Sequence, residues 1–171
     1  MHGMMNAIKS LRRLMKKNNP EAFMQMATEH KSGEGVFQSD TKSLEMRICA
    51  AELGHADAFI NIGSSYQEGV VVEQNIVKAV EYYEVAAKKG SVHAHKVLAG
   101  FHGRNGNKQQ CIGHVKVAAS AGDKEAMDDL MRVYKDKLIS KEELTQTLRA
   151  YQTSKNAMKS KDRDDVHDAI V

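Results

Sequence analysis

The chain of 171 residues contains no tryptophan, a single proline, Pro20, and only two cysteines, Cys49 and Cys111. Two cysteines without CxxC spacing are too few for the disulfide framework of a small secreted domain, so a reducing compartment is the simpler interpretation. No apolar run reaches the roughly 18 residues that a membrane-spanning helix needs, and no signal-peptide pattern is found. We therefore expect a soluble protein of the cytoplasm or nucleus with no membrane span.

The chain also lacks the alternating pattern of β-branched and polar residues that half-buried strands require. Alanine is frequent, and the one proline lies where it can begin a helix rather than break one. We therefore predict an all-α fold. A chain of this length can bury about 70% of its unfolded surface, so its core needs no disulfide or metal.

What the sequence does contain is an internal repeat. Glycines close successive segments that each contain a pair of alanines, and the alanines that open the segments are 36, 36 and 32 residues apart. The closing residues are Gly54, Gly90 and Gly122, and the opening residues are Ala22, Ala58, Ala94 and Ala126. A period of this length predicts a right-handed α-solenoid of about four helix-pair repeats with capping helices at both ends.

The predicted boundaries follow from this period. A basic amphipathic capping helix occupies residues 1–18, and the repeats occupy 19–54, 55–90 and 91–122, the last with a loop shortened by four residues. Residues 123–171 form a degenerate fourth repeat with an extended C-terminal helix and a charged tail.

Several residues mark where the helices begin. Asn19 and Asn75 are predicted N-caps, and Pro20 suits the first helical position. Asp40 is expected to cap the second helix of the first repeat, and Ser140 with Glu143 forms a capping box before the C-terminal helix.

The second repeat carries a recognisable pattern. Residues 58–90 read AxxxxGxxYxxG, a short loop of glycine and valine, then KAxxYYxxAAxxG, which resembles the Sel-one-like repeat (SLR), a relative of the tetratricopeptide repeat. His30 and His102 replace the tyrosine equivalent to Tyr66. The whole chain is also similar to algal SLR proteins with a TLRAYQ segment before a KSxDRD tail, some of which carry a RING domain whose cysteines are absent here. The resemblance implies a helical solenoid that binds other proteins.

A solenoid exposes one long face, so we predict a non-catalytic scaffold or adaptor that binds a protein or peptide partner through its concave side. Positions 2, 6 and 9 after each opening alanine lie opposite the packing stripe of the first helix of each repeat. These positions are Met24, Thr28 and Lys31; Ile60, Ser64 and Gln67; Lys96, Gly100 and Gly103; and Asp128, Arg132 and Lys135. The predicted protein-binding residues among them are Lys31, Ser64, Gln67, Lys96, Arg132 and Lys135.

Two other functions stay open. The RING domains found beside similar repeats suggest a regulatory subunit of an enzyme complex such as a ubiquitin ligase, and the third alternative is a small enzyme with an unrecognised site. Cys111 has His114 three residues away but no orienting third group. His93, His95 and His102 lack the i, i+4 spacing of a helical metal site. We assign no catalytic residue, cofactor or metal ligand.

The N-terminal segment concentrates positive charge. Lys9, Arg12, Arg13, Lys16 and Lys17 fall within residues 1–19, which contain no acid. We interpret the segment first as a helix that caps the first repeat; a targeting or membrane-surface segment and a partner or nucleic-acid contact are the alternatives. No aromatic residue interleaves these basic residues, so nucleic-acid binding is not expected.

Overall fold

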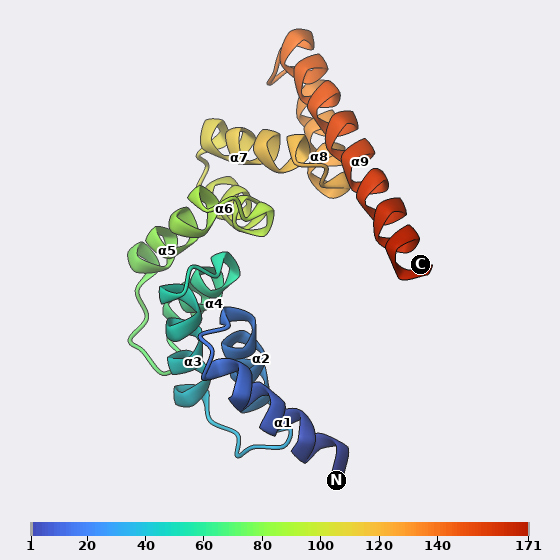
Figure 1. The fold of residues 1–171 in the computed structure, drawn as a ribbon. Coiled ribbons are helices and arrows are strands. Elements are labelled where there is room, and N and C mark those ends of the chain that lie inside the picture. Colours follow the sequence, from blue (N-terminus) through green and yellow to red (C-terminus); the bar gives the residue numbers. More distant parts are fainter. Residues whose placement is uncertain (1, 171) are drawn as a thin grey trace. The chain divides into compact units, whose positions relative to one another are not determined.

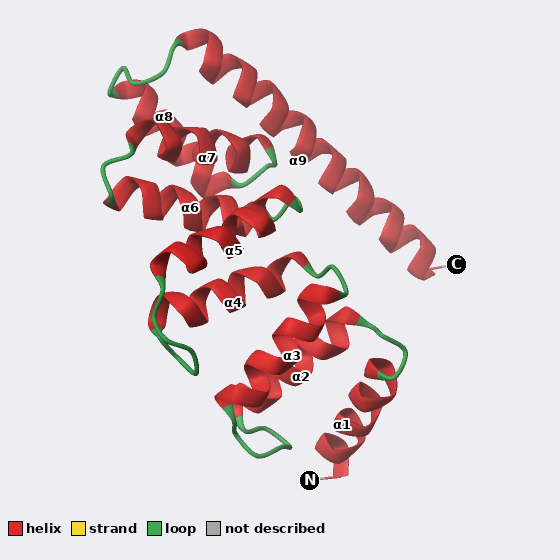
Figure 2. Ribbon diagram, turned by 90° about the vertical axis from the view of Figure 1, so that its left-hand side faces the viewer, coloured by secondary structure: helices red, strands yellow, loops and turns green. Residues whose placement is uncertain are grey.

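The computed structural model describes residues 2–170, and the side chains of residues 6–161. Within that range it consists of nine α-helices joined by short loops, without a strand (Figures 1 and 2). The helices are α1 (His2–Met15), α2 (Pro20–Ser32), α3 (Asp40–Glu52), α4 (Ala56–Glu68), α5 (Ile76–Lys88), α6 (Val92–Arg104), α7 (Lys108–Ser120), α8 (Lys124–Lys135) and α9 (Lys141–Ile170). The all-α prediction is confirmed. The chain forms two compact units, Met1–Ala94 and His95–Val171, here called unit 1 and unit 2.

Most predicted helix starts are confirmed. The Asn19 side chain accepts a hydrogen bond from the backbone N–H of Ala22 at 3.1 Å, and Asn75 accepts one from Lys78 at 2.9 Å. Pro20 occupies the first turn of α2. At the start of α9 the Ser140 hydroxyl and the Glu143 carboxylate each accept a hydrogen bond from the other residue's backbone N–H, as a capping box requires.

The predicted cap of α3 is wrong by one residue. Ser39 has extended backbone angles and its hydroxyl accepts from the N–H of Lys42 at 3.3 Å, whereas Asp40 is already the first helical residue. The Asp40 carboxylate instead forms an ion pair with Lys31 at 2.8 Å. A negative charge in the first turn also suits the positive end of the helix dipole.

The closing glycines serve the repeat as the sequence indicates. Gly54, Gly90 and Gly122 have φ angles of 91°, 89° and 92°, in the left-handed region that a residue with a side chain rarely adopts. Each therefore ends the second helix of a repeat and turns the chain into the next one.

In unit 1 the helices pack as successive pairs. Ile8 and Leu11 of α1 are buried against Ala22 and Met26 of α2. Helices α2 and α3 form one pair, α4 and α5 form the next, and α3 packs on α4. The amphipathic N-terminal helix thus covers the apolar side of α2 and leaves its basic residues exposed.

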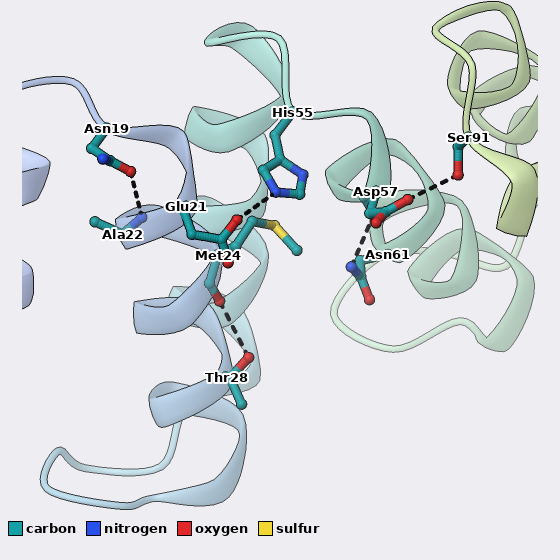
Figure 3. A network of polar contacts seen from close by, with 9 residues as sticks. All are labelled: Asn19, Glu21, Ala22, Met24, Thr28, His55, Asp57, Asn61 and Ser91. Carbon is teal, nitrogen blue, oxygen red and sulfur yellow. Dashed lines mark hydrogen bonds and ion pairs between the residues drawn. The ribbon is translucent and has the colours of Figure 1, made fainter. Parts of the chain in front are cut away.

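The junctions between repeats in unit 1 share one polar contact (Figure 3). Glu21 in the first turn of α2 pairs with His55, the residue before α4, at 3.1 Å. One period later, Asp57 in the first turn of α4 accepts a hydrogen bond from the Ser91 hydroxyl at 2.8 Å. Because these residues are related by 36 positions, the period repeats a contact as well as a pattern of apolar residues.

In unit 2, α7 packs on α8, and α9 packs on both. The Ser154 hydroxyl donates a hydrogen bond to the carbonyl oxygen of Ser120 at 2.8 Å, which fixes α9 along α7. Leu144 of α9 is buried. The helix continues through the charged segment that follows Gln152 and ends at Ile170.

Candidate protein-binding grooves

Unit 2 contains a groove of about 440 Å³ lined by α6, α7 and α8, here called the unit 2 groove. Its floor is made of small apolar residues, namely Ala99, Gly100, Gly103, Val115 and Ala118. Three of the inner-face positions predicted for the third repeat, Lys96, Gly100 and Gly103, line it together. The two glycines contribute no side chain to the α6 side of the groove, which leaves space between Lys96, Ala99 and Arg104 of the same helix.

Charged residues stand at the rim of this groove. Lys96 forms ion pairs with Asp123, at 3.3 Å, and with Glu125. The hydrogen bond to Glu125 is the main cause of a raised pKa at Lys96, and the backbone N–H of Ala126 is the main cause of a lowered pKa at Asp123. The positive charge of Lys96 is thus offset by these two carboxylates.

Two further rim residues, Arg104 and Asp129, differ in their partners. Asp129 pairs with Arg132 at 2.7 Å. Arg104 lines the groove and has no ion pair among residues 6–161. Arg104 is therefore a rim cation that, among the described side chains, is free to meet an acidic group.

Unit 1 has a groove of about 250 Å³ lined by α2, α3 and α4, here called the unit 1 groove. Lys31 and Ser64 line it, together with Ser43, Arg47 and Asn61. Burial lowers the pKa of the Arg47 guanidinium, and the negative charges of nearby Asp40 and Glu68 oppose this shift. The groove is polar and contains the Lys31–Asp40 ion pair.

The two grooves are built from equivalent positions. The second helices of successive repeats are offset by 36 and 32 residues, so Arg47, Tyr83 and Val115 occupy one position of the repeat. Arg47 lines the unit 1 groove and Val115 lines the unit 2 groove. This position changes from a cation to an aromatic ring to a small aliphatic side chain.

In the second repeat Tyr83 fills the equivalent space. It is 2% exposed, donates a hydrogen bond to Gln67 Oε1 at 3.1 Å, and its hydroxyl lies 3.4 Å from Ser64 Oγ. A Cβ atom added at Gly63 would lie 2.6 Å from the Tyr83 ring. Gly63 therefore admits the ring, and its equivalent in the third repeat, Ala99, faces the smaller Val115.

The structure places the six predicted binding residues in different surroundings. Lys31 and Ser64 line the unit 1 groove, and Lys96 lines the unit 2 groove. Gln67 is half-buried against Tyr83. Arg132 and Lys135 are exposed on α8 and line neither groove.

One inner-face expectation is wrong, and several groove residues were missed. Ile60 was expected on the exposed face but is 6% exposed, because its apolar side chain packs into the core. Arg104 and Val115 of the unit 2 groove were not predicted, because only three positions on the first helix of each repeat were considered. Comparing second-helix positions between repeats would have shown Val115 to be much smaller than Tyr83.

Three histidines also come together in unit 2. The Nδ1 atoms of His95 and His114 are 3.0 Å apart, and the His102 and His114 rings stack with centroids 5.5 Å apart. The spacing did not predict this group, because His95 and His102 are two helical turns apart and His114 is on another helix. Burial lowers the pKa of His95.

The histidines occupy the positions of an aromatic cluster in the second repeat. His95, His102 and His114 are equivalent to Phe59, Tyr66 and Tyr82, whose rings pack with centroid distances of 6.4 Å for Phe59–Tyr82 and 5.6 Å for Tyr66–Tyr82. The histidines thus take over a packing role. In the part of the chain whose side chains are described, no group of three or more His, Cys, Asp or Glu residues is arranged to hold a metal ion.

Cys111 lines the unit 2 groove as a neutral thiol. Burial is the main cause of its raised pKa, and the negative charge of Asp129 adds to it. A nucleophilic cysteine needs the opposite shift, because the thiolate is the reactive form. The groove therefore offers Cys111 as an apolar contact.

Among the described residues, no helix is both long enough and apolar enough to cross a bilayer.

Comparison with known proteins identifies the repeats. The Sel1 repeat family matches residues 20–55 and 56–91. A Sel1 repeat protein from Oxalobacter formigenes has a similar structure, with 28% sequence identity and a TM-score of 0.68 over 88% of this chain and 63% of that protein. A protective antigen of uropathogenic Escherichia coli with an SLR fold has 23% identity and a TM-score of 0.67 over 88% of this chain. This chain spans 63% and 34% of the lengths of those two proteins. None of the curated proteins compared with the chain matches it.

Proposed function

We propose that this chain, a helical repeat protein with two Sel1 repeats, is a non-catalytic scaffold that binds a protein partner through the unit 2 groove. Sel1 repeat proteins generally mediate protein–protein interactions. The observation that supports the proposal is an open, apolar groove at a position where the second repeat is filled by Tyr83.

The floor of the groove defines one part of the partner. Its volume of about 440 Å³ falls within the roughly 300–1,000 Å³ range of ligand pockets. Ala99, Val115 and Ala118 offer no hydrogen-bonding side-chain group, so the floor suits an apolar side chain. Helices fixed by packing keep the groove formed before binding, which lowers the entropic cost of association.

The rim defines the other part. Lys96 is neutralised by Asp123 and Glu125, and the Asp129 carboxylate is paired with Arg132. Among the described side chains Arg104 has no such partner. The partner segment therefore presents an apolar side chain with a carboxylate nearby, which Arg104 can bind by paired hydrogen bonds.

The test transfers a pair of residues from the second repeat to the equivalent positions of the third. The double variant Ala99→Gly/Val115→Tyr places the Gly63–Tyr83 pair of the second repeat into the third and fills the groove. Partners are recovered by affinity purification from the native cell, and the shortest binding segment of the main partner is titrated calorimetrically. We expect the double variant to weaken binding at least tenfold. Arg104→Gln should weaken it by about tenfold, in line with loss of a charged hydrogen bond.

The matched control is Gly113→Ala, on the same helix as Val115 but with nothing near the added methyl group. This variant should bind as tightly as the unchanged chain. Equal affinity of the groove-filled variant and the unchanged chain for the same segment would contradict the proposal.

A further inference from the structure

The exposed face of α1 and the turn that follows it carry a dense positive charge. Lys9, Arg12, Arg13, Lys16 and Lys17 are all exposed, and none forms an ion pair with a residue whose side chain is described. At about 100° per residue the first four fall within an arc of about 100°, turned away from buried Ile8 and Leu11. Packing on α2 therefore uses one side of the helix and leaves the charged side free.

Beside this helix the loop between α2 and α3 presents Phe37. Its side chain is 94% exposed, the largest value among the large apolar residues described. The neighbouring Val36 packs against the core formed by α1 and α2. Adjacent residues of one loop thus point in opposite senses, one into the core and one into solvent.

The loop is held in this conformation. His30 Nδ1 lies 3.2 Å from the carbonyl oxygen of Phe37. The Gln38 side chain donates a hydrogen bond to the carbonyl oxygen of Lys31 at 3.0 Å. The backbone N–H of Ser39 donates one to the carbonyl oxygen of His30 at 2.8 Å. The second repeat builds the same loop, where Gln74 donates to Gln67.

The residue equivalent to Phe37 in the second repeat is the exposed Glu73. The loop accepts a charged residue at this position, so its fold does not require a phenylalanine there.

Phe37 and the basic residues meet at one hollow. Arg12 of α1, Phe37 and Val36 of the loop, and His30 and Lys42 line a depression of about 590 Å³, with no acidic residue in its lining. Lys42 is exposed and forms no ion pair with a described side chain. Cations from two helices therefore line the same depression as an exposed aromatic ring.

We propose that this surface, consisting of the basic face of α1, the following Lys16 and Lys17, Lys42 and Phe37, attaches unit 1 to an anionic lipid surface. Basic side chains are attracted to anionic headgroups, and an exposed aromatic ring enters the interface between headgroups and acyl chains. A protein partner is less well matched, because lysine, which supplies four of these six basic residues, is depleted at protein–protein interfaces. The attachment is peripheral and uses residues remote in sequence from those of the unit 2 groove.

The test is co-sedimentation of the full chain with lipid vesicles. One set contains phosphatidylcholine alone and the other about one-third phosphatidylserine. We expect binding to the anionic vesicles only, and its loss when the salt is raised from about 0.05 to about 0.5 M, because salt screens exposed charges. The triple variant Arg12→Gln/Arg13→Gln/Lys16→Gln should lower the partition coefficient by about 100-fold, at roughly fivefold per cation.

Matched controls separate this surface from overall charge and hydropathy. Lys108→Gln/Lys124→Gln/Lys141→Gln removes the same charge from exposed lysines of unit 2, and should leave binding within about twofold. Phe37→Gln should weaken binding several-fold, whereas Val77→Gln, at another strongly exposed apolar residue, should not. Helix content by circular dichroism confirms that each variant is folded.

Three results would overturn the proposal. They are equal binding to neutral and anionic vesicles, an equal loss in the two triple variants, and tighter binding to an acidic polypeptide such as polyglutamate than to the anionic vesicles. The last result would assign the surface to a protein partner.

Discussion

The two grooves occupy equivalent positions of the repeat but have opposite chemistry. The unit 1 groove is lined by Ser43, Arg47 and Asn61, and the unit 2 groove has Cys111, Val115 and Asp129 at the same positions. The first is polar and contains the Lys31–Asp40 ion pair, whereas the second has an apolar floor. The period therefore decides where a groove forms, and substitutions at equivalent positions of both helices decide what it can bind.

The second repeat explains how one position has this effect. Tyr83 fills the space that Val115 leaves open, and Gly63 is the residue that makes room for its ring. In the third repeat both residues of this pair differ: Val115 replaces Tyr83, and Ala99 replaces Gly63. This pair of residues is thus one difference between the second and third repeats, and it can be exchanged.

The largest effect is expected for Tyr83→Val, which gives the second repeat the residue of the third. A cavity left in a fully buried site should cost about 2–4 kcal/mol in the free energy of unfolding. Adding Gly63→Ala should recover about 1 kcal/mol or more, because the methyl group occupies part of the vacated space. Urea unfolding of the two single variants and the double variant measures this coupling. Strict additivity would show that the two residues act independently.

The next effect is that of Gly63→Ala alone. The added Cβ would lie 2.6 Å from the Tyr83 ring and 3.0 Å from the carbonyl oxygen of Ala79, so we expect a loss of about 1–3 kcal/mol despite the better helix propensity of alanine. Gly113→Ala, where nothing lies within 4 Å, should instead gain about 0.5–1 kcal/mol. If the unfolding temperature shifted in the same direction in both variants, the close approach of the Tyr83 ring to Gly63 would be refuted.

A smaller effect is expected in the pH dependence of stability, which should distinguish the histidine cluster of the third repeat from the aromatic cluster of the second. Burial lowers the pKa of His95 below its ordinary value of 6.5, so the unfolded chain binds more protons than the folded chain as the pH falls. The free energy of unfolding is therefore highest above about pH 6.5 and decreases as the pH drops below it. Protonation of both His95 and His114 would also break the contact between their Nδ1 atoms. Urea midpoints of the unchanged chain should fall between pH 7.5 and pH 5.5.

The control is His95→Phe, which restores the residue of the second repeat at this position. Its urea midpoint should depend less on pH over the same range. An equal pH dependence in both proteins would assign the effect to other groups.

The smallest effects concern the exposed ion pairs at the two grooves. Lys31→Ala removes the pair with Asp40, and Lys96→Ala removes those with Asp123 and Glu125. Because the side chains are partly solvated, each variant should lose less than about 1 kcal/mol in urea unfolding. A loss much greater than this at Lys96 would show that the rim stabilises unit 2 as well as shaping the groove.

The features that the sequence predicted correctly are those that depend on residues close to one another along the chain. The caps at Asn19 and Asn75 and the closing glycines follow from local backbone geometry, so pattern alone identified them. The cap of α3 was misplaced because Ser39 and Asp40 are both good caps and adjacent in sequence.

Contacts between helices were harder to predict. The histidine cluster combines residues seven positions apart with one on another helix, and the unit 2 groove depends on Val115, whose small size matters only beside Gly100 and Gly103. These features follow from the packing of one helix on another, which the repeat pattern does not specify.

Alkylation of Cys111 tests most directly whether a partner occupies the unit 2 groove. Cys111 lines the groove, and Cys49, a second free cysteine in unit 1, provides an internal reference in the same protein. Reaction with iodoacetamide at a fixed alkaline pH, followed by mass spectrometry of the two peptides, gives both rates with and without the purified partner segment. A bound partner should slow the reaction of Cys111 and leave that of Cys49 unchanged. An unchanged Cys111 rate at a saturating concentration of the segment would contradict binding in the groove.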